Sequence, residues 1–290
     1  MPGINDSKCV LVIGATAGIG RALALAIHAL PSKPTVIVAG RRKERLDELV
    51  KKGDGRIEAM QVDISSGKDM LKAFADEVIQ KFPDVSPDSG GIDYRADLTS
   101  YFSLLKLDAV LFAAGIQRAA DFKEPEKIDL DALFEEVHVN YLAILALTKF
   151  LLPHFLRLSS EGRPTFIIPI SSGLAMVPVT HVTSYCATKA AVHSLSMSLR
   201  ISLSDTNVHI MEIMPPVISM GSDGLLTEQG TTEAISKNWM PLDEFTKYTM
   251  EGLQRGDFNI VVPSMKEIWN NVEAERVALS GRILFAKKGN

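Results

Sequence analysis

The feature that most constrains the fold is a glycine-rich turn between a short apolar run and a helical pattern. Residues 8–14 (KCVLVIG) are apolar after the lysine and end at a glycine, which is typical of a buried parallel strand. Residues 14–20 (GATAGIG) follow, and residues 21–30 (RALALAIHAL) then show helical periodicity. Strand, glycine turn and helix in this order place a helix N-terminus where it can bind a phosphate. The alternative is a turn whose small residues serve packing only.

Strand and helix patterns continue to alternate along the chain. Further strands are predicted at residues 35–39, 56–62, 108–113, 163–170, 208–214 and 259–262. Helical patterns occupy residues 69–82, 130–158, 183–204, parts of 231–252, and 265–279. The alternation predicts an α/β fold, a doubly wound parallel sheet (Rossmann fold), as a single domain over residues 1–290. Ligands of such sheets bind at the carboxyl ends of the strands.

Two segments stand apart from this alternation. Residues 83–107 begin with a stretch rich in Pro, Gly, Asp and Ser, and we interpret them as an inserted excursion at one edge. Residues 220–258 begin with a polar, glycine-containing stretch, and we expect them to form a small C-terminal lid over the substrate.

The candidate catalytic residues lie in residues 170–189 (ISSGLAMVPVTHVTSYCATK). Tyr185 and Lys189 are four residues apart, so a helix would place them on one face, and Ser172 lies thirteen residues before the tyrosine. A phenol has a pKa of roughly 10, and a neighbouring ammonium group is expected to lower it. With a serine hydroxyl to bind a substrate oxygen, the three groups could exchange a proton with that oxygen, which is half of a carbonyl reduction. The alternative is a chance Tyr–Lys pair on a half-solvated helix face.

The ends of other strands carry candidate nucleotide contacts. Arg41 and Arg42 follow the second strand, and no Asp or Glu occurs in residues 35–43. An acidic residue there favours NAD, whereas arginine suits the 2′-phosphate of NADP, so we expect NADP(H); ordinary surface charge is the alternative. Asp63 could contact the adenine or cap the following helix. Ala114 and Gly115 are small enough for backbone to pass close to the adenosine ribose.

Composition excludes several other classes of function. The formal net charge of −4 and the absence of a basic stripe argue against nucleic acid as a partner. Cys9 and Cys186 are the only cysteines and cannot make a metal site or a disulfide framework, so we expect no metal. The N-terminus lacks a signal-peptide pattern, and the longest apolar run, residues 141–152, is interrupted by Lys149 and is too short to span a bilayer. We therefore expect a cytoplasmic protein without a membrane partner.

Taken together, these features resemble the short-chain dehydrogenase/reductase family in its single-domain form. The resemblance covers roughly residues 8–220 and rests on the GATAGIG turn, residues 113–115, Asn140, Ser172, Tyr185 and Lys189. It implies that Tyr185 is the general acid/base and that Lys189 lowers its pKa and holds the nicotinamide ribose. It also implies that Ser172 orients the substrate oxygen and that Asn140 keeps a water in the proton path.

The resemblance also assigns residues to the cofactor. Those that it implies for NADP(H) binding are Gly14, Thr16, Ala17, Gly18, Ile19, Gly20, Arg41, Arg42, Asp63, Ile64, Ala114, Gly115, Asn140, Tyr185, Lys189, Pro215 and Ile218. The chain departs from the family pattern at several of these strand ends. Ile13 replaces a usual Thr, Phe112-Ala113 replace a usual Asn, Pro215-Pro216 replace a usual Pro-Gly, and Met220 stands where a Thr is frequent.

The function that follows is an NADP(H)-dependent carbonyl reductase or alcohol dehydrogenase. Two alternatives stay open: a non-catalytic NADP-binding regulator or scaffold, and an NAD-dependent epimerase or dehydratase, which shares the Tyr–Lys pair but usually needs a larger C-terminal domain. A serine hydrolase is disfavoured because Ser172 is not in a G-x-S-x-G turn.

Substrate and assembly are predicted more coarsely. An apolar or aromatic ketone or aldehyde is expected from the probable wall residues Met176, Val177, Val179, Leu225, Leu226 and Trp239, unless these only pack the lid. His181 could line the mouth of the pocket. The resemblance implies a homodimer or homotetramer formed through residues 130–158 and 185–204.

Overall fold

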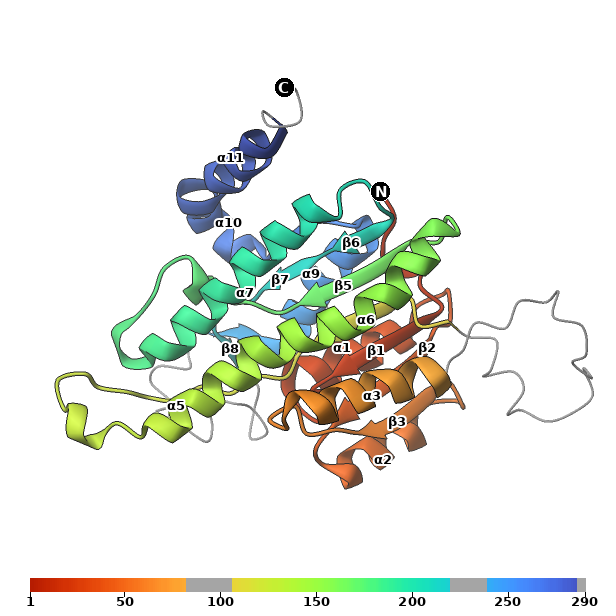
Figure 1. Ribbon diagram of the computed structural model, residues 1–290, viewed down its shortest axis with the longest axis horizontal. Helices are drawn as coiled ribbons and strands as arrows, with labels where there is room; N and C mark the ends of the chain where they lie inside the picture. The colour runs from red at the N-terminus through yellow and green to blue at the C-terminus, as the bar shows by residue number, and fades with distance from the viewer. Residues whose placement is uncertain (82–105, 220–238, 286–290) are drawn as a thin grey trace, which may run out of the picture.

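A six-stranded parallel sheet organises the computed structural model, which describes residues 1–81, 106–219 and 239–285 (Figure 1). Its strand order is β3–β2–β1–β4–β5–β6. The strands are β1 (Cys9–Ile13), β2 (Thr35–Gly40), β3 (Ile57–Gln61), β4 (Ala109–Phe112), β5 (Thr165–Pro169) and β6 (Val208–Ile210). This order, which reverses direction next to β1, is that of a doubly wound sheet, and the predicted fold is confirmed.

The predicted sixth strand is divided in two. β6 pairs with β5, whereas β7 (Glu212–Met214) pairs in parallel with β10 (Asn259–Val261). The Met211 N–H still donates to the Ile167 carbonyl at 3.0 Å, so the chain continues along β5 across the break. A second small pair joins β8 (Ile218–Ser219) to β9 (Met240–Pro241). The last predicted strand, residues 259–262, corresponds to β10.

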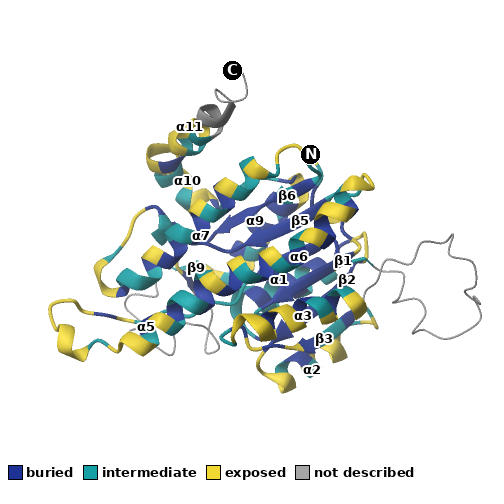
Figure 2. Ribbon diagram, viewed as in Figure 1, coloured by how far each residue is buried: buried dark blue, intermediate teal, exposed yellow. Residues whose placement is uncertain are grey.

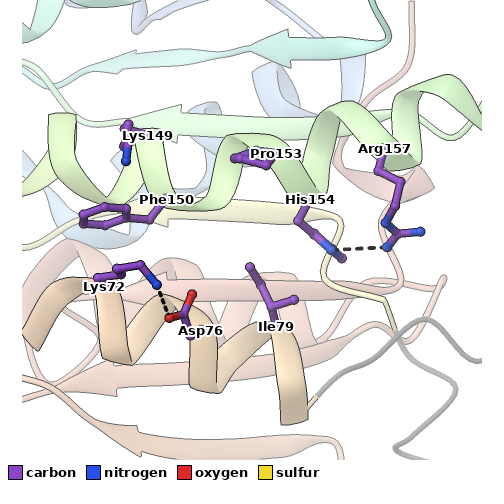
Figure 3. A pocket seen from close by; sticks show the side chains of 8 residues that line it. All are labelled: Lys72, Asp76, Ile79, Lys149, Phe150, Pro153, His154 and Arg157. Carbon is purple, nitrogen blue, oxygen red and sulfur yellow. Dashed lines mark hydrogen bonds and ion pairs between the residues drawn. The ribbon is translucent and has the colours of Figure 1, made fainter. Parts of the chain in front are cut away.

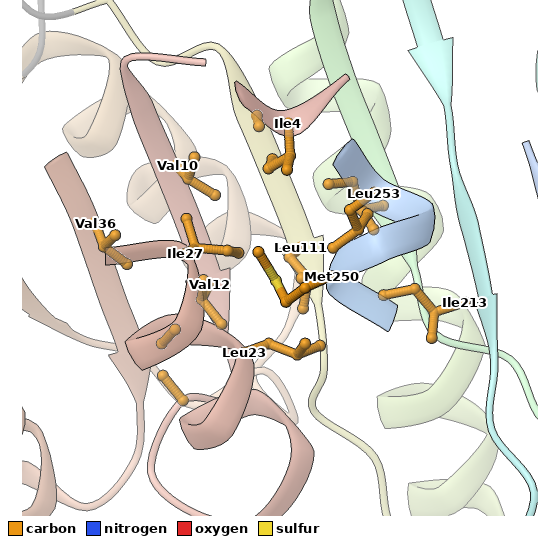
Figure 4. Packing of buried hydrophobic residues seen from close by; sticks show 14 of the residues in the cluster. Ile4, Val10, Val12, Leu23, Ile27, Val36, Leu111, Ile213, Met250 and Leu253 are labelled. Atoms are coloured by element: carbon orange, nitrogen blue, oxygen red, sulfur yellow. The ribbon is translucent and has the colours of Figure 1, made fainter. Parts of the chain in front are cut away.

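Helices cover both faces of the sheet (Figure 1). On one face lie α1 (Gly18–His28), α2 (Lys43–Lys52) and α9 (Leu242–Arg255); on the other lie α3 (Lys68–Lys81), α5 (Leu130–Val137), α6 (Ala143–Ser160) and α7 (Thr183–Ser202). Side chains of β1 alternate between these layers. Val10 and Val12 pack with α1 and α9 (Figure 4), and Leu11 packs with α3 and α6. A strand buried on both faces explains why the run is continuously apolar.

Helix α9 corrects part of the predicted lid. Phe245 and Leu253 have no exposed surface and pack with α1 and the sheet, so α9 belongs to the core instead of lying over a substrate. Residues 220–238 of the predicted lid lie outside the described residues. So do residues 83–105 of the predicted insertion.

The predicted helix over residues 130–158 contains a break. A π-helical turn, His138–Leu142, separates α5 from α6, whereas Pro153 lies within α6. The stretch Leu130–Ser160 is long and apolar enough to cross a membrane by composition alone, but half of its most apolar window is buried in the fold. It packs as a core helix does, against β4 and α3.

The C-terminal segment extends away from the body (Figures 1 and 2). It runs through η8 (Pro263–Met265), α10 (Lys266–Ile268), a π-helical turn η9 (Trp269–Glu273) and α11 (Ala274–Phe285). The remaining short turns are η1 (Ile4–Asp6), η2 (Pro125–Lys127), η4 (Gly173–Ala175) and η5 (Thr180–Val182). Because all main strands are parallel, the residues that follow them meet at one edge of the sheet, which is where the candidate site lies.

Candidate active site

Helix α7 presents Tyr185 and Lys189 one turn apart at the carboxyl edge of the sheet. Lys189 is buried, with 4% of its surface exposed, and its Nζ donates to the carbonyl oxygen of Ile170 at 2.9 Å. The same Nζ lies 5.4 Å from the centre of the Tyr185 ring. Ile170 directly follows β5, so one hydrogen bond ties the amine to the end of a central strand. The prediction that these two side chains lie on one face of a helix is confirmed.

Ser172 completes the group from the loop after β5. Its Oγ accepts the backbone N–H of Leu174 at 3.1 Å, which shapes the turn η4. The N–H of Gly173 donates to the Pro215 carbonyl at 2.9 Å, so the loop after β7 holds this turn in place. The Ser172 hydroxyl is near enough to the Tyr185 phenol to act on its pKa, which it lowers against the larger effect of burial. Phenol, amine and hydroxyl therefore share one small volume.

The electrostatics of the pair differ from the prediction. Burial raises the pKa of the Tyr185 phenol, and the Ser172 hydroxyl offsets this only in part. Burial also lowers the pKa of Lys189 to about 8, against the charges of Glu136 and Glu212. The expected lowering of the phenol pKa is not seen in the chain by itself, because burial raises it and only Ser172 acts in the opposite direction. At neutral pH the phenol carries its proton and the amine is mostly charged.

Asn140 lies in the π-helical turn between α5 and α6 and is fully buried. Its Oδ1 accepts the N–H of Ile116 at 2.9 Å, and its Nδ2 donates to the carbonyl of Ile116 at 2.8 Å and to the Thr188 hydroxyl at 3.2 Å. The amide thus binds the loop after β4 to the catalytic helix. The π turn brings this polar side chain inward, as such turns often do at functional sites.

Gly115 lies against the same groups. A Cβ placed on it would be 3.3 Å from Oδ1 of Asn140 and 3.7 Å from Nζ of Lys189. A side chain here would crowd the Asn140 amide and come into ordinary contact with the amine. The small residue predicted after the fourth strand therefore leaves room beside Lys189.

The glycine turn has the features that an anion needs. Gly14 has φ of +90°, and a Cβ there would lie 2.3 Å from the Ala114 backbone nitrogen, so only glycine lets the ends of β1 and β4 approach. Ala17 is the N-cap of α1, and no side chain caps its first turn. Uncapped N–H groups at a helix N-terminus favour a phosphate. These residues fit the pyrophosphate of a dinucleotide.

The arginines after β2 lie close to this turn. Arg42 donates to the Thr16 hydroxyl from Nη2 at 2.8 Å and from Nε at 3.2 Å. Arg41 is exposed, and its carbonyl accepts the Gln61 side chain at 2.8 Å. Cationic charge therefore stands beside the candidate phosphate site, with no acidic side chain between residues 35 and 43.

The other predicted cofactor residues occupy varied positions. The Asp63 carboxylate accepts the N–H and the hydroxyl of Ser65 at 2.9 and 2.8 Å, so it stabilises a local turn and does not cap α3. Ile64 and Ile218 are buried. Gly18, Ile19 and Gly20 form the first turn of α1, and Ala114 is partly exposed beside the turn.

Sequence reasoning missed one buried acid at the site, Glu136 on α5. Its Oε2 accepts the backbone N–H of Arg118, and its Oε1 is buried without a hydrogen-bond partner in the described part of the chain. It could have been found from helical spacing, because Glu136 lies three residues after the buried Leu133 and four before Asn140.

A second missed group is a buried cluster one turn beyond Lys189. Both nitrogens of His193 face carboxylates: Nδ1 lies 2.8 Å from Oε2 of Glu212, and Nε2 lies 2.8 Å from Oε1 of Glu273. Glu273 comes from the π turn η9, so the cluster binds the C-terminal segment to α7 and β7. Residues so far apart in sequence carry no local signal.

The expected substrate wall is only partly described. Met176 is buried, Val177 is 45% exposed and Val179 and Trp239 are partly exposed. His181 is exposed, and its carbonyl accepts the N–H of Ala120 at 3.1 Å. Leu225 and Leu226 lie outside the described residues.

A separate surface pocket of about 500 Å³ lies between α3 and α6 (Figure 3). His154, one of its lining residues, hydrogen-bonds the carbonyl of Leu107, which precedes β4. At His154 the pocket therefore lies near the amino end of β4, and Tyr185 is not among its lining residues. Its other lining residues are Lys72, Asp76, Ile79, Lys149, Phe150, Pro153 and Arg157.

Fold and site together define the doubly wound α/β class of oxidoreductase. A sequence model of the short chain dehydrogenase family matches residues 8–87 and 99–229, more than half of the 290 residues. The chain belongs to the short-chain dehydrogenase/reductase family. The match is interrupted at residues 88–98, within the predicted insertion.

Several curated proteins are similar over most of their length. The uncharacterized oxidoreductase DltE of Bacillus subtilis is 29% identical over 86% of this chain and 86% of its own. The 3-oxoacyl-[acyl-carrier-protein] reductase FabG of Thermotoga maritima is 24% identical over 83% of this chain and 86% of its own. An 11-beta-hydroxysteroid dehydrogenase-like protein of Arabidopsis thaliana is 27% identical over 96% of this chain and 81% of its own.

Solved structures share the fold. A short-chain dehydrogenase from Sphingobium yanoikuyae in complex with NADPH has a TM-score of 0.71 at 20% identity, covering 98% of this chain and 96% of that one. A short-chain dehydrogenase/reductase from Burkholderia phymatum in complex with NAD has a TM-score of 0.71 at 16% identity, covering 92% of each chain.

Proposed function

We propose that the protein is an NADP(H)-dependent carbonyl reductase or alcohol dehydrogenase with Tyr185 as its general acid/base. The observation that carries this proposal is the grouping of Tyr185, Lys189 and Ser172 at the carboxyl edge, beside an uncapped glycine turn. When bound, the nicotinamide supplies or accepts the hydride, and the protein supplies position and protons. The substrate would be a ketone, an aldehyde or a secondary alcohol.

The protonation states support a reductive step. Because burial keeps the Tyr185 phenol protonated, it can donate its proton to a carbonyl oxygen as the carbon receives the hydride. The Ser172 hydroxyl, already beside the phenol, would donate a hydrogen bond to the same oxygen. The Lys189 ammonium would balance the negative charge left on the phenolate. Alcohol oxidation would use the same groups in reverse.

NADP(H) is proposed over NAD(H) because Arg41 and Arg42 stand at the end of β2. One similar solved structure holds NADPH and another holds NAD, so these structures favour neither cofactor. The preference proposed for NADP(H) therefore rests on the two arginines. We expect Arg41→Ala to weaken NADPH binding about tenfold or more and NADH binding by less than about threefold. Lys43→Ala, which removes a surface pair with Asp47, is the matched control. Equal effects of Arg41→Ala on both nucleotides would argue against recognition of the 2′-phosphate.

An apolar or aromatic carbonyl is the proposed substrate class. The apolar side chains of Met176, Val177 and Val179 follow Ser172 directly, and Val177 is exposed. Relatives named for 3-oxoacyl and 11-beta-hydroxysteroid reactions support a carbonyl or hydroxyl on a largely apolar skeleton. A screen of NADPH oxidation over aliphatic, aromatic and steroid-like carbonyls, run beside NADH, tests this. Stoichiometric NADPH binding without oxidation of any carbonyl would favour a binding protein instead.

Self-association is proposed through the outer side of α5 and α6. Leu130, Phe134, Leu142 and Leu145 are exposed there, between 39% and 67%. Exposed apolar side chains grouped on adjoining helices are typical of an interface. Sedimentation of the wild-type protein should give a dimer or tetramer, and Phe134→Glu should shift it toward the monomer. A wild-type monomer at all concentrations would contradict the proposal.

A further inference from the structure

Glu136 stands where three parts of the active site meet. It belongs to α5, its Oε2 accepts the backbone N–H of Arg118 in the loop after β4, and the Ser184 hydroxyl at the start of α7 is near enough to favour the ionised carboxylate. The side chain has no exposed surface. A buried carboxylate that binds the loop and lies beside the start of the helix limits how far the two can move apart.

The charges around Glu136 give it a second role. Burial raises the pKa of Glu136, and the charges of Arg118 from the loop after β4 and of Lys189 from α7 offset this only in part. In return, the carboxylate favours the cationic form of Lys189 and disfavours the phenolate of Tyr185. Its neighbour Glu135 lies toward solvent. The Glu135 carboxylate is 3.2 Å from the Arg118 guanidinium, and the Glu135 side chain is 40% exposed.

Resting on the proposed function, we propose that Glu136 is a positioning residue for the catalytic group. It holds the loop at Arg118 beside the first turn of α7, and its ionised carboxylate supplies the negative charge that acts on Lys189 and Tyr185. Asn140 holds the same loop two residues earlier, at Ile116, so the two side chains clamp it together. Asn140 contributes no charge, which leaves the electrostatic role to Glu136.

The substitution Glu136→Gln separates charge from shape. Glutamine can still accept the Arg118 N–H, so the fold should be retained, but the negative charge is lost. Glu135→Gln removes an equal charge one residue away and is the matched control. We expect the titration of Lys189 to move to lower pH by about one unit in Glu136→Gln and to stay unchanged in Glu135→Gln.

Two readouts test this, one of them without turnover. The first is carbon-13 NMR of labelled lysine side chains, with the Lys189 signal assigned by its loss in Lys189→Arg. The second is the pH profile of kcat for carbonyl reduction, whose alkaline limb should move in the same direction. A shifted NMR titration in a protein that reduces no carbonyl would support the role of Glu136 while contradicting the proposed function. An unshifted Lys189 titration in Glu136→Gln would overturn the inference, whatever the activity.

Discussion

Lys189 lies one turn beyond Tyr185 on α7, with its Nζ 5.4 Å from the centre of the tyrosine ring. The same Nζ is held by the Ile170 carbonyl at 2.9 Å. The catalytic helix is thereby joined to the end of β5 at the position where the phenol needs a cation. Burial of Lys189 and partial burial of Tyr185 then set how each one titrates.

The pH dependence of reduction follows from the lowered pKa of Lys189. This pKa is about 8, so the cation is present below that pH and is lost above it. Burial raises the phenol pKa, so loss of the Tyr185 proton should not limit the rate first. We expect kcat/KM for NADPH, which reports on the free enzyme, to fall about tenfold per pH unit above pH 8. A value that increases steadily through this range would contradict the assignment.

The clamp formed by Asn140 predicts a large loss of stability in Asn140→Ala. The substitution leaves the N–H and the carbonyl of Ile116 without their partners in a partly buried loop. We expect the free energy of unfolding to fall by about 2–4 kcal/mol in urea titrations. Thr188→Val removes only one of the three hydrogen bonds of Asn140 and should cost about 1 kcal/mol. Equal losses in the two variants would show that Asn140 does not hold the loop.

Gly14 and Gly115 should respond differently to alanine. Gly14→Ala meets a positive φ and a backbone atom at 2.3 Å, so we expect a loss of more than about 2 kcal/mol in the free energy of unfolding. Gly115→Ala meets only Asn140 and Lys189, at 3.3 and 3.7 Å. Its stability should change by less than about 1 kcal/mol, while kcat falls about tenfold because the Asn140 amide is displaced beside the amine. Thermal unfolding and steady-state rates on both variants distinguish a folding effect from a site effect.

The buried cluster of His193 predicts that the C-terminal segment depends on one imidazole. His193→Leu would leave Glu212 and Glu273 buried without their shared partner, so we expect a loss of about 3–5 kcal/mol in the free energy of unfolding. The control is Arg276→Gln, since Arg276 pairs with Glu273 from a half-exposed side chain and should cost less than about 1 kcal/mol. Trp269, whose ring is edge-on to His193 at 6.4 Å, reports undocking by fluorescence in a Trp239→Phe background.

The same cluster predicts the sign of a pH effect on stability. Burial lowers the pKa of His193, but the hydrogen bonds and charges of Glu212 and Glu273 outweigh burial and raise it overall. The stabilisation is therefore complete below the unfolded-state value of roughly 6.5 and is lost as pH rises through the higher folded-state value. Urea midpoints measured across this range should fall in the wild-type protein and stay flatter in His193→Leu. Parallel pH curves for the two proteins would place the effect elsewhere.

Local patterns were sufficient for the fold because most strands are short apolar runs that alternate with helical patterns. The positions of Gly14, Ala114, Ser172 and Pro215 at one edge follow from parallel strands alone. The π turn at Asn140 was not predictable, because the apolar spacing on either side of it continues as in one helix. The apolar face of α9 can be recognised from helical spacing, but the sequence does not show what that face packs against. Its partner, α1, lies more than two hundred residues earlier, so the placement of α9 in the core was missed.

Electrostatics was the part that sequence could not supply. The spacing of Tyr185 and Lys189 indicates that the two groups interact, but it carries no information on how deeply they are buried. Burial decides the direction of both pKa shifts. Glu136 on α5 and Glu212 on β7 oppose the lowering of the Lys189 pKa from other elements, at distances in sequence that no local pattern spans.

The central claim is that the Tyr185 hydroxyl transfers the proton, and Tyr185→Phe tests it most directly. Phenylalanine keeps the ring and removes only the hydroxyl. Single-turnover oxidation of bound NADPH by a carbonyl that the wild-type protein reduces should slow by about a thousandfold, with the dissociation constant for NADPH changed by less than about threefold. A variant that binds NADPH and reduces the carbonyl within about tenfold of the wild-type rate would show that another group supplies the proton.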